Sequence, residues 1–306
     1  MKVVYSPKYN IDLGVLNRLH PFDGTKFEKV ERGIRGTADV EFVAPEGPVN
    51  DEVIEAFVDP LMKRLIKGKR YILGALEVPY LPVLPFSLID RYVLAAMRWA
   101  VAGTIHASRL ALQERTVCWN VGGGYHHASR HAAEGFCIYN DIGIAYDGLI
   151  RSGGLRPEDR ILIVDVDAHH GNGNARVFAE TPNVVLADVY NQDIYPASPV
   201  TRQRVDLPVP LPSGTTGAAY LQKLESMLQR IAGKYRLAFV VAGTDVLASD
   251  PLGRLKLTVE DCAERDRMVV ARMRAVADGT VVVAGGGYSV DSSRAMIAGI
   301  RGVAEA

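Results

Sequence analysis

Short apolar runs rich in Val, Ile and Leu alternate with longer amphipathic stretches along most of the chain. The apolar runs predict β-strands over residues 2–5, 116–121, 160–166, 184–189, 237–242 and 280–284. The longer stretches predict helices over residues 53–67, 88–113, 142–150, 218–231 and 259–276. Strands that are apolar on both faces and separated by helices are typical of a parallel sheet covered on both sides. The pattern therefore predicts an α/β fold with an open parallel sheet flanked by helices.

No repeat, low-complexity tract or Ser/Gly linker divides the chain into parts of different composition. The simplest prediction is a single domain that spans residues 1–306. Three prolines, Pro79, Pro82 and Pro85, interrupt the helical pattern and predict an ordered surface loop before the longest helix.

The composition narrows the class of protein. Hydrophobic residues make up 48% of the 306 residues and charged residues 23%, so the chain can bury a large core and is not of disordered type. The 35 Lys plus Arg balance the 35 Asp plus Glu, which excludes binding of nucleic acid or an anionic membrane through excess positive charge. No run approaches the roughly 18 apolar residues of a membrane span, and the first ten residues do not form a secretory signal. We therefore expect a cytoplasmic protein.

Three cysteines, Cys118, Cys137 and Cys262, lie far apart in the sequence and form no CxxC motif. This spacing argues against a disulfide framework and against a structural zinc site made of cysteines. We expect them to be buried and to behave as apolar residues.

Polar side chains follow two of the predicted strands. Asp165, Asp167 and His169 alternate with apolar residues at the end of one strand, so an extended backbone would place all three on one side. Asp245 ends a second strand in the same way. Two carboxylates and one imidazole on neighbouring strand ends can bind a divalent metal and leave a fourth position open to water. A single aspartate in such a place would instead be interpreted as a helix cap or an ion-pair partner.

Four of the seven histidines form two adjacent pairs, and both pairs lie beside glycines at predicted strand ends. Histidines of a hydrophobic core are not expected to cluster in this way. The pair His126 and His127 follows three glycines, which let the backbone approach a ligand closely but are also compatible with a tight turn. A second glycine run precedes Tyr288, whose hydroxyl can stabilise an oxyanion or simply pack at the rim of a pocket.

The order of these motifs resembles the zinc-dependent histone deacetylase superfamily, most closely its class IV branch and the bacterial-type histone deacetylase-like amidohydrolases. The resemblance extends almost from end to end. It is carried by VYSPKYN (4–10), HPFD (20–23), GGGYHH (122–127), EGFC (134–137), DVDAHHGNG (165–173), DVYN (188–191), IYP (194–196), GTDVL (243–247) and GGY (286–288). Each motif is short, but their order is specific. The family has an open parallel α/β sheet, the arginase/deacetylase fold, which agrees with the strand pattern.

The resemblance implies the metal sites. Asp167, His169 and Asp245 match the three ligands of a single catalytic Zn²⁺. The backbone carbonyls of Asp165, Asp167 and His169, together with the Asp188 side chain, match a monovalent site for K⁺ or Na⁺ near the zinc. The histidine that follows His169 is not a ligand in the family.

The resemblance also implies the catalytic groups. His126 and His127 match a tandem acid/base pair, in which Asp165 would hydrogen-bond His126 and favour its charged form. Tyr288 matches the residue that polarises the acyl carbonyl. The substrate channel would be lined by Gly135, Phe136, Tyr195 and Leu252.

One position departs from the common family pattern. The partner of His127 is Asn172, where most relatives have a carboxylate. Asparagine can fix the tautomer of the imidazole but brings no charge, so His127 should be less basic than in carboxylate-paired relatives. Class IV relatives also carry asparagine here, and the departure therefore supports that branch.

The expected reaction is hydrolysis of an amide by metal-activated water, with removal of acetyl or longer fatty acyl groups from the ε-amine of lysine. The partners would be acyl-lysine proteins or peptides, with no direct nucleic-acid binding and no membrane. A ureohydrolase with two metals is excluded, because its extra ligands would fall on Gly171 and Leu247. An amidohydrolase acting on acetylpolyamines would share every catalytic residue, and a non-catalytic acyl-lysine binding module should have lost one.

Overall fold

A parallel sheet forms the centre of the computed structural model, which describes residues 1–11 and 22–306. Its eight strands within these residues are β1 (Lys2–Val4), β2 (Glu41–Val43), β3 (Val117–Asn120), β4 (Ile161–Asp165), β5 (Val184–Asn191), β6 (Leu207–Leu211), β7 (Tyr235–Val241) and β8 (Ala277–Val283). They lie in the order β2-β1-β3-β8-β7-β4-β5-β6, and all neighbouring pairs are parallel. The predicted fold class is therefore confirmed.

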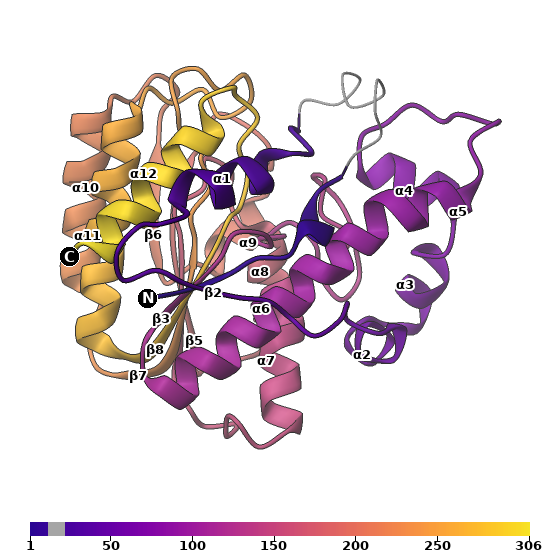
Figure 1. Cartoon of the computed structure of the whole chain (residues 1–306), viewed down its shortest axis with the longest axis horizontal. Helices are drawn as coiled ribbons and strands as arrows, with labels where there is room; N and C mark the ends of the chain where they lie inside the picture. The colour runs from indigo at the N-terminus through magenta and orange to yellow at the C-terminus, as the bar shows by residue number, and fades with distance from the viewer. Residues whose placement is uncertain (12–21) are drawn as a thin grey trace.

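Helices cover both faces of this sheet (Figure 1). One face is covered by α1 (Lys26–Ile34), α10 (Gly217–Arg230), α11 (Val259–Val276) and α12 (Ser292–Ala304). The other face is covered by α6 (Ala95–Glu114), α7 (Asp141–Arg151) and α8 (Asn172–Val177). In β4, Leu162 and Val164 pack toward the first group of helices, whereas Ile161 and Ile163 pack toward the second. Both faces of the strand are thus buried, which explains its continuous apolar sequence.

The helix predicted over 53–67 is wrong in its continuity. The chain forms two helices there, α2 (Asp51–Phe57) and α3 (Pro60–Leu65). The first helix ends with Val58 as its C-cap, and Asp59 caps the second, with its side-chain Oδ1 2.6 Å from the Met62 amide nitrogen. Pro60 occupies the first turn of α3, where its missing N–H costs nothing, but its ring is incompatible with a helix that continues through it.

The helix predicted over 88–113 is helical along its whole length. It consists of α5 (Phe86–Ile89), a π-helical turn η3 (Asp90–Leu94) and the long α6. The proline-rich loop before it follows α4 (Lys69–Ala75) and is exposed at its tip, where Val83 is 92% exposed. In the part of the chain that the structure describes, no helix is both long and apolar enough to cross a bilayer.

The N-terminal family motifs are only partly described. The first motif forms β1 and a short 3-10 helix, η1 (Pro7–Tyr9), capped by the Ser6 side chain. In the second motif, His20 and Pro21 lie outside the described residues, whereas Phe22 packs against the core beside α1.

The three cysteines are buried and unbonded to one another, as the sequence suggested. Burial raises the pKa of Cys118 and of Cys262 to about 12, and that of Cys137 moves in the same direction. All three thiols therefore stay protonated near neutral pH and do not behave as reactive nucleophiles.

Candidate active site

The polar residues singled out in the sequence lie at the carboxyl ends of neighbouring strands. His126 and His127 follow β3, Tyr288 follows β8, Asp245 follows β7, and Asp167 follows β4. Because the sheet is parallel, these ends share one edge, which is where open α/β sheets bind their ligands.

Asp167, His169 and Asp245 form a buried cluster in which one possible ligand atom from each residue lies within 4.8 Å of the others. The Nδ1 atom of His169 is 2.8 Å from Asp245 Oδ2 and 3.2 Å from Asp167 Oδ1. Asp165 does not join this cluster, although an extended strand would have placed it there. Its carboxylate bonds His126 instead, because β4 ends at Asp165 and the backbone leaves the strand conformation beyond it.

The chemistry of this cluster fits a divalent metal ion. Burial, followed by the charge of Asp167, raises the pKa of Asp245 to about 7. Burial lowers the pKa of His169, but its hydrogen bonds to the two carboxylates outweigh burial and raise it to about 10. Two carboxylates this close together in a buried site repel each other, and this is costly unless a cation lies between them and binds both. Two carboxylate oxygens and an imidazole nitrogen are the donor set of an open zinc site.

Glycines allow the backbone to approach the two carboxylates of the cluster. A Cβ atom on Gly243 would lie 2.0 Å from Asp167 Oδ2, and one on Gly286 would lie 2.4 Å from Asp245 Oδ2. The Gly286 amide donates a hydrogen bond of 2.7 Å to Asp167 Oδ2. Glycine is needed at these two positions because any side chain would collide with a carboxylate oxygen of the cluster.

The two adjacent histidines have different partners. His126 Nδ1 is 2.7 Å from Asp165 Oδ2, and His127 Nδ1 is 2.7 Å from Asn172 Oδ1. Burial lowers the pKa of His126, but the charges of Asp165 and of the neighbouring Asp167 outweigh burial and raise it to about 9. Burial lowers the pKa of His127 well below its usual value, and the nearby His126 adds to this effect. One imidazole is thus stabilised as a cation and the other as a neutral base.

Tyr288 follows β8 and faces both the cleft and the apolar cavity described below. Its amide donates a hydrogen bond of 2.7 Å to Asp250 Oδ2, which fixes the loop after β8. Burial, followed by the charge of Asp245, raises the pKa of Tyr288 well above its usual value. The phenol therefore remains protonated and can donate a hydrogen bond.

An open cleft leads to these groups, and its wall contains the predicted channel residues Gly135, Phe136, Tyr195 and Leu252. The Tyr195 ring lies edge-on to His127 at 5.1 Å between centroids. The Phe136 ring lies 5.6 Å from the Tyr288 ring in a similar arrangement. Aromatic side chains thus flank both the imidazole and the phenol.

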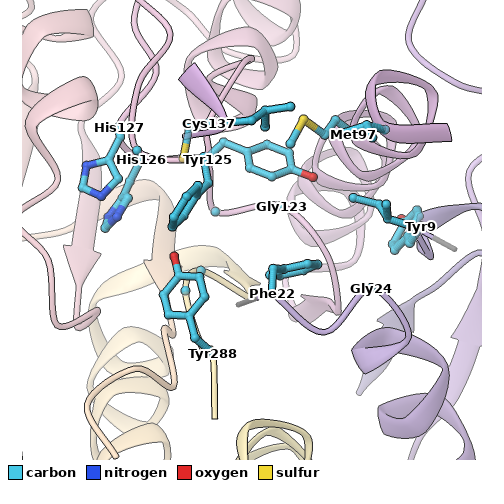
Figure 2. A pocket seen from close by; sticks show the side chains of 18 of the residues that line it. Tyr9, Phe22, Gly24, Met97, Gly123, Tyr125, His126, His127, Cys137 and Tyr288 are labelled. Carbon is cyan, nitrogen blue, oxygen red and sulfur yellow. The ribbon is translucent and has the colours of Figure 1, made fainter. Parts of the chain in front are cut away.

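A second, largely apolar cavity adjoins the site and is partly open to solvent. Figure 2 shows His126, His127 and Tyr288 at one end of this cavity and Tyr9 and Met97 at the other. The cavity therefore begins at the reacting groups and extends toward η1 and α6.

His170 is not part of the cluster. Its Nδ1 lies 2.6 Å from Asp188 Oδ2 and its Nε2 lies 2.9 Å from Thr201 Oγ1, so the side chain has a structural place. Among the described residues, Asp188 Oδ1 is buried and has no hydrogen-bond partner. A buried carboxylate oxygen without a donor is suited to a cation.

Sequence reasoning did not identify four residues that support the site, namely Lys26, Glu134, Asp250 and Arg265. Each contacts a part of the site that is distant in the sequence, and Glu134, although it lies inside a quoted motif, was given no role. A buried charge within a helix was the only available sequence signal for Lys26 and Arg265, and it cannot be recognised without the fold.

Residues 57–302 match the family model described as Histone deacetylase domain. With the site geometry above, this match shows that the chain belongs to the histone deacetylase family. The relation makes it a hydrolase of the deacetylase type, while the class IV branch stays a prediction.

Individual relatives agree with this family. Histone deacetylase 2 of Arabidopsis thaliana is 33% identical over 299 residues, which cover 96% of this chain and 76% of that protein. The acetoin utilization protein AcuC of Bacillus subtilis is 24% identical over 94% of this chain and 77% of that protein. A probable deacetylase of Archaeoglobus fulgidus is 29% identical over 69% of this chain and 59% of that protein. The crystal structure of the HDA15 HD domain has a TM-score of 0.74 at 17% identity and covers 100% of this chain and 90% of that one, which supports the fold.

Proposed function

We propose that the chain is a zinc-dependent lysine deacylase, which removes an acetyl or longer acyl group from the ε-amine of lysine. One observation carries this proposal. The Asp167, His169 and Asp245 cluster lies with two buried imidazoles and a tyrosine at the point where an open cleft meets an apolar cavity. Amide hydrolysis needs groups that polarise the carbonyl, accept a proton and donate a proton, and all are present here.

In this proposal Asp167, His169 and Asp245 hold one Zn²⁺. The bound ion would supply Lewis-acid polarisation of the acyl oxygen and a lowered pKa of the attacking water. The glycine amide that bonds Asp167, and the Ala168 amide that donates a 2.8 Å hydrogen bond to Asp245 Oδ1, keep the carboxylates oriented.

Proton transfer is assigned to His127. Its Nδ1 faces Asn172, so Nε2 is free to accept the proton of water as the water oxygen bonds to the acyl carbon. His127 then delivers this proton to the amide nitrogen as the C–N bond breaks, which yields a carboxylic acid and a lysine amine. His126, kept cationic by Asp165, stabilises negative charge at the acyl group.

Tyr288 is assigned the role of a hydrogen-bond donor to the acyl oxygen. A preorganised donor is most useful where charge develops in a dry site, because it need not reorient during the reaction. The aliphatic stem of the lysine would pass the channel residues Gly135, Phe136, Tyr195 and Leu252.

The apolar cavity is assigned to the acyl chain. It is lined mostly by apolar side chains, including Leu76, Val93 and Met97, and it opens directly beside the reacting groups. An acetyl group would contact few of these apolar side chains, whereas a longer acyl chain would bury methylenes against them at about 0.8 kcal/mol each. We therefore propose longer acyl groups as the better substrates.

Further assignments belong to the same proposal. The unpartnered Asp188 Oδ1 supports a monovalent K⁺ or Na⁺ held with the backbone carbonyls of Asp165, Asp167 and His169. The chain is proposed to act as one catalytic domain over 1–306, because β1 and α1 belong to the same sheet and core as the rest. A cytoplasmic location, an acyl-lysine protein or peptide partner and membership of class IV remain predictions.

The proposal is tested with lysine peptides that carry acetyl, octanoyl and myristoyl groups, assayed beside acetylated polyamines. We expect hydrolysis of the lysine peptides, with kcat/KM rising with chain length. Preference for the polyamines would favour the alternative amidohydrolase, and binding of acyl-lysine without any turnover would favour a non-catalytic module.

Metal analysis of the purified protein tests the cofactor. We expect one zinc per chain, loss of turnover on chelation and recovery on addition of zinc. Two metals per site, or full activity without metal, would contradict the assignment.

A further inference from the structure

His127 has no carboxylate directly against its Nδ1 atom, but a carboxylate, that of Glu134, reaches it through Asn172. Asn172 Oδ1 lies 2.7 Å from His127 Nδ1, and Asn172 Nδ2 donates a hydrogen bond of 2.8 Å to Glu134 Oε1. Arg176, one turn along α8 from Asn172, forms an ion pair with the same Glu134 oxygen. His127, Asn172, Glu134 and Arg176 thus form a continuous polar line that runs outward from the site.

The chemistry of this line fixes its direction. An ionised carboxylate can only accept hydrogen bonds, so the NH₂ group of Asn172 must face Glu134. The carbonyl oxygen of Asn172 must then face His127 and can only accept, so the proton of neutral His127 resides on Nδ1. Nε2 is left unprotonated toward the site. An asparagine alone would not specify this tautomer, because a flipped amide presents a donor instead of an acceptor.

Glu134 also reaches His127 by a second route. Its backbone forms paired hydrogen bonds with Cys137, of 3.1 and 3.0 Å, that close the turn containing Gly135. A Cβ atom on Gly135 would lie only 2.5 Å from Cδ2 of His127, so this turn packs directly on the imidazole. Burial first, and then the charge of the Glu134 carboxylate, raise the pKa of Tyr195, whose ring contacts His127 from the cleft.

We propose that Glu134 is a positioning residue that acts through Asn172 to hold His127 in the tautomer able to accept a proton. The carboxylate that the family resemblance leads us to expect directly against the imidazole is here displaced outward, with asparagine as the relay. The inference rests on the proposed function insofar as His127 is the proton acceptor. The tautomer and orientation of His127, however, can be measured without turnover.

The first test is Glu134→Gln. Glutamine has nearly the same shape but can also donate, so it no longer dictates the orientation of Asn172. We expect kcat to fall about 10- to 100-fold, as is typical when the partner of an active-site histidine is altered, with KM nearly unchanged. Glu264→Gln, which removes a carboxylate from an exposed ion pair on α11, is the matched control and should leave kcat unchanged.

A reciprocal exchange makes the test specific. Asn172→Asp alone places two carboxylates at the 2.8 Å spacing now occupied by the amide and Glu134, and should also lose activity. The double variant Glu134→Gln/Asn172→Asp restores one carboxylate and one amide in exchanged order, with the carboxylate now accepting directly from Nδ1. We expect kcat to recover at least about tenfold over either single variant, the reverse of the fall. Additive losses in the double variant would overturn the proposal.

Nitrogen-15 NMR of histidine-labelled protein provides a readout that is independent of the reaction. Wild type and the double variant should show His127 protonated on Nδ1, and Glu134→Gln should show a mixture of tautomers. An unchanged tautomer in Glu134→Gln, in a folded protein, would overturn the relay. If the NMR result holds but no variant or wild type hydrolyses acyl-lysine, the relay stands and the proposed function fails.

Discussion

His126 and His127 favour different protonation states because the side chains that face their Nδ1 atoms differ. The ring centroids of His126 and His127 are only 4.1 Å apart, so it would be costly for both rings to carry a positive charge at once. The Asp165 carboxylate beside one ring and the Asn172 amide beside the other decide which ring carries the charge. The same residue type therefore provides a fixed cation and a neutral base within one site.

At the residue scale, Tyr288→Phe removes one hydroxyl and almost no volume. We expect kcat to fall about 100- to 1000-fold, the usual cost of losing a single oxyanion donor, with zinc content and thermal stability unchanged. Steady-state kinetics on the best acyl-lysine peptide, beside metal analysis, are the measurement. A kcat close to wild type would mean that Tyr288 merely lines the pocket.

Lys26 is a fully buried lysine, and its described partners are a backbone carbonyl and aromatic rings. Its Nζ is 3.4 Å from the Gly287 carbonyl and 4.9 Å from the centre of the Phe22 ring. Burial lowers its pKa from 10.5 to about 8, although the charges of Asp245 and Asp167 oppose this shift. The folded state thus binds fewer protons here than the unfolded state between about pH 8 and pH 10.5. The free energy of unfolding therefore rises with pH in that window as far as this lysine is concerned. Below about pH 8 the lysine is charged in both states, and the cost of burying its ammonium group does not change with pH.

Lys26→Met should therefore stabilise the protein near neutral pH. At about 1.36 kcal/mol per pKa unit, the gain in free energy of unfolding is at most about 3 kcal/mol, and it should vanish as the pH approaches about 10.5. We expect kcat to fall at the same time, because the carbonyl next to Tyr288 loses its donor. Urea unfolding at about pH 7 and about pH 10 measures the first effect. A variant less stable than wild type at the lower pH would show that the ammonium is net stabilising.

At the scale of elements, one side chain of α11 ties together the ends of β4 and β7. The Arg265 guanidinium is fully buried and donates hydrogen bonds of 3.1 Å to the Val166 carbonyl and 2.5 Å to the Gly243 carbonyl. These carbonyls lie one and two residues before Asp167 and Asp245. Asp266 accepts a 2.9 Å hydrogen bond from Arg265 Nε and balances its charge.

Arg265→Met should loosen both strand ends and leave Asp266 as an uncompensated buried charge. We expect the free energy of unfolding to fall by about 3 to 5 kcal/mol. We also expect the affinity for zinc to fall roughly 10- to 100-fold. Arg267→Met, which breaks only an exposed ion pair on the same helix, should change stability by less than about 0.5 kcal/mol. The double change Arg265→Met/Asp266→Leu should recover stability but not zinc affinity. Recovery of both would mean that Arg265 has no positioning role.

The sequence predicted elements well where burial is continuous and poorly where it is not. The apolar runs of β4, β7 and β8 face helices on both sides, and their positions were predicted to within a few residues. The edge strand β6 was missed, because Pro208 and Pro210 alternate outward and interrupt the apolar pattern. The short strand β2, with no fully buried residue, gave no periodic signal at all.

For the candidate site, the motif order was informative because the proposed metal ligands and the histidines follow strands that the parallel sheet brings to one edge. Glu134 and Arg265 could not be predicted in the same way. Glu134 lies 38 residues from Asn172, and the guanidinium of Arg265 reaches a carbonyl 99 residues away. Contacts of this kind depend on how elements pack, and a single sequence carries no local pattern for them.

At the scale of the whole molecule, the site separates two spaces of different chemistry. The cleft that leads in from solvent is lined by polar residues such as Gln192, Asp193 and Arg254 together with aromatic ones. The cavity on the inner side is mostly apolar and lies between the sheet edge and α6. A substrate with a polar backbone, an amide and an apolar chain matches this order from outside to inside.

The last prediction concerns the inner space. Val93 lies on the π-helical turn η3, is only partly buried and lines the cavity. Val93→Trp should fill part of the cavity without touching any catalytic group. Excluding two methylene groups of a fatty acyl chain costs about 1.6 kcal/mol, so kcat/KM for a myristoyl-lysine peptide should fall roughly tenfold relative to acetyl-lysine.

Val200→Trp is the matched control, because Val200 is 77% exposed and should leave both substrates unaffected. The ratio of the two kcat/KM values is the decisive quantity, since it cancels losses of active or folded enzyme that affect both peptides equally. If the ratio is unchanged in Val93→Trp while thermal unfolding shows a folded protein, the acyl chain does not enter this cavity. In that event the acyl chain would have to lie along the outer cleft, and the proposed preference for long acyl groups would lose its structural basis.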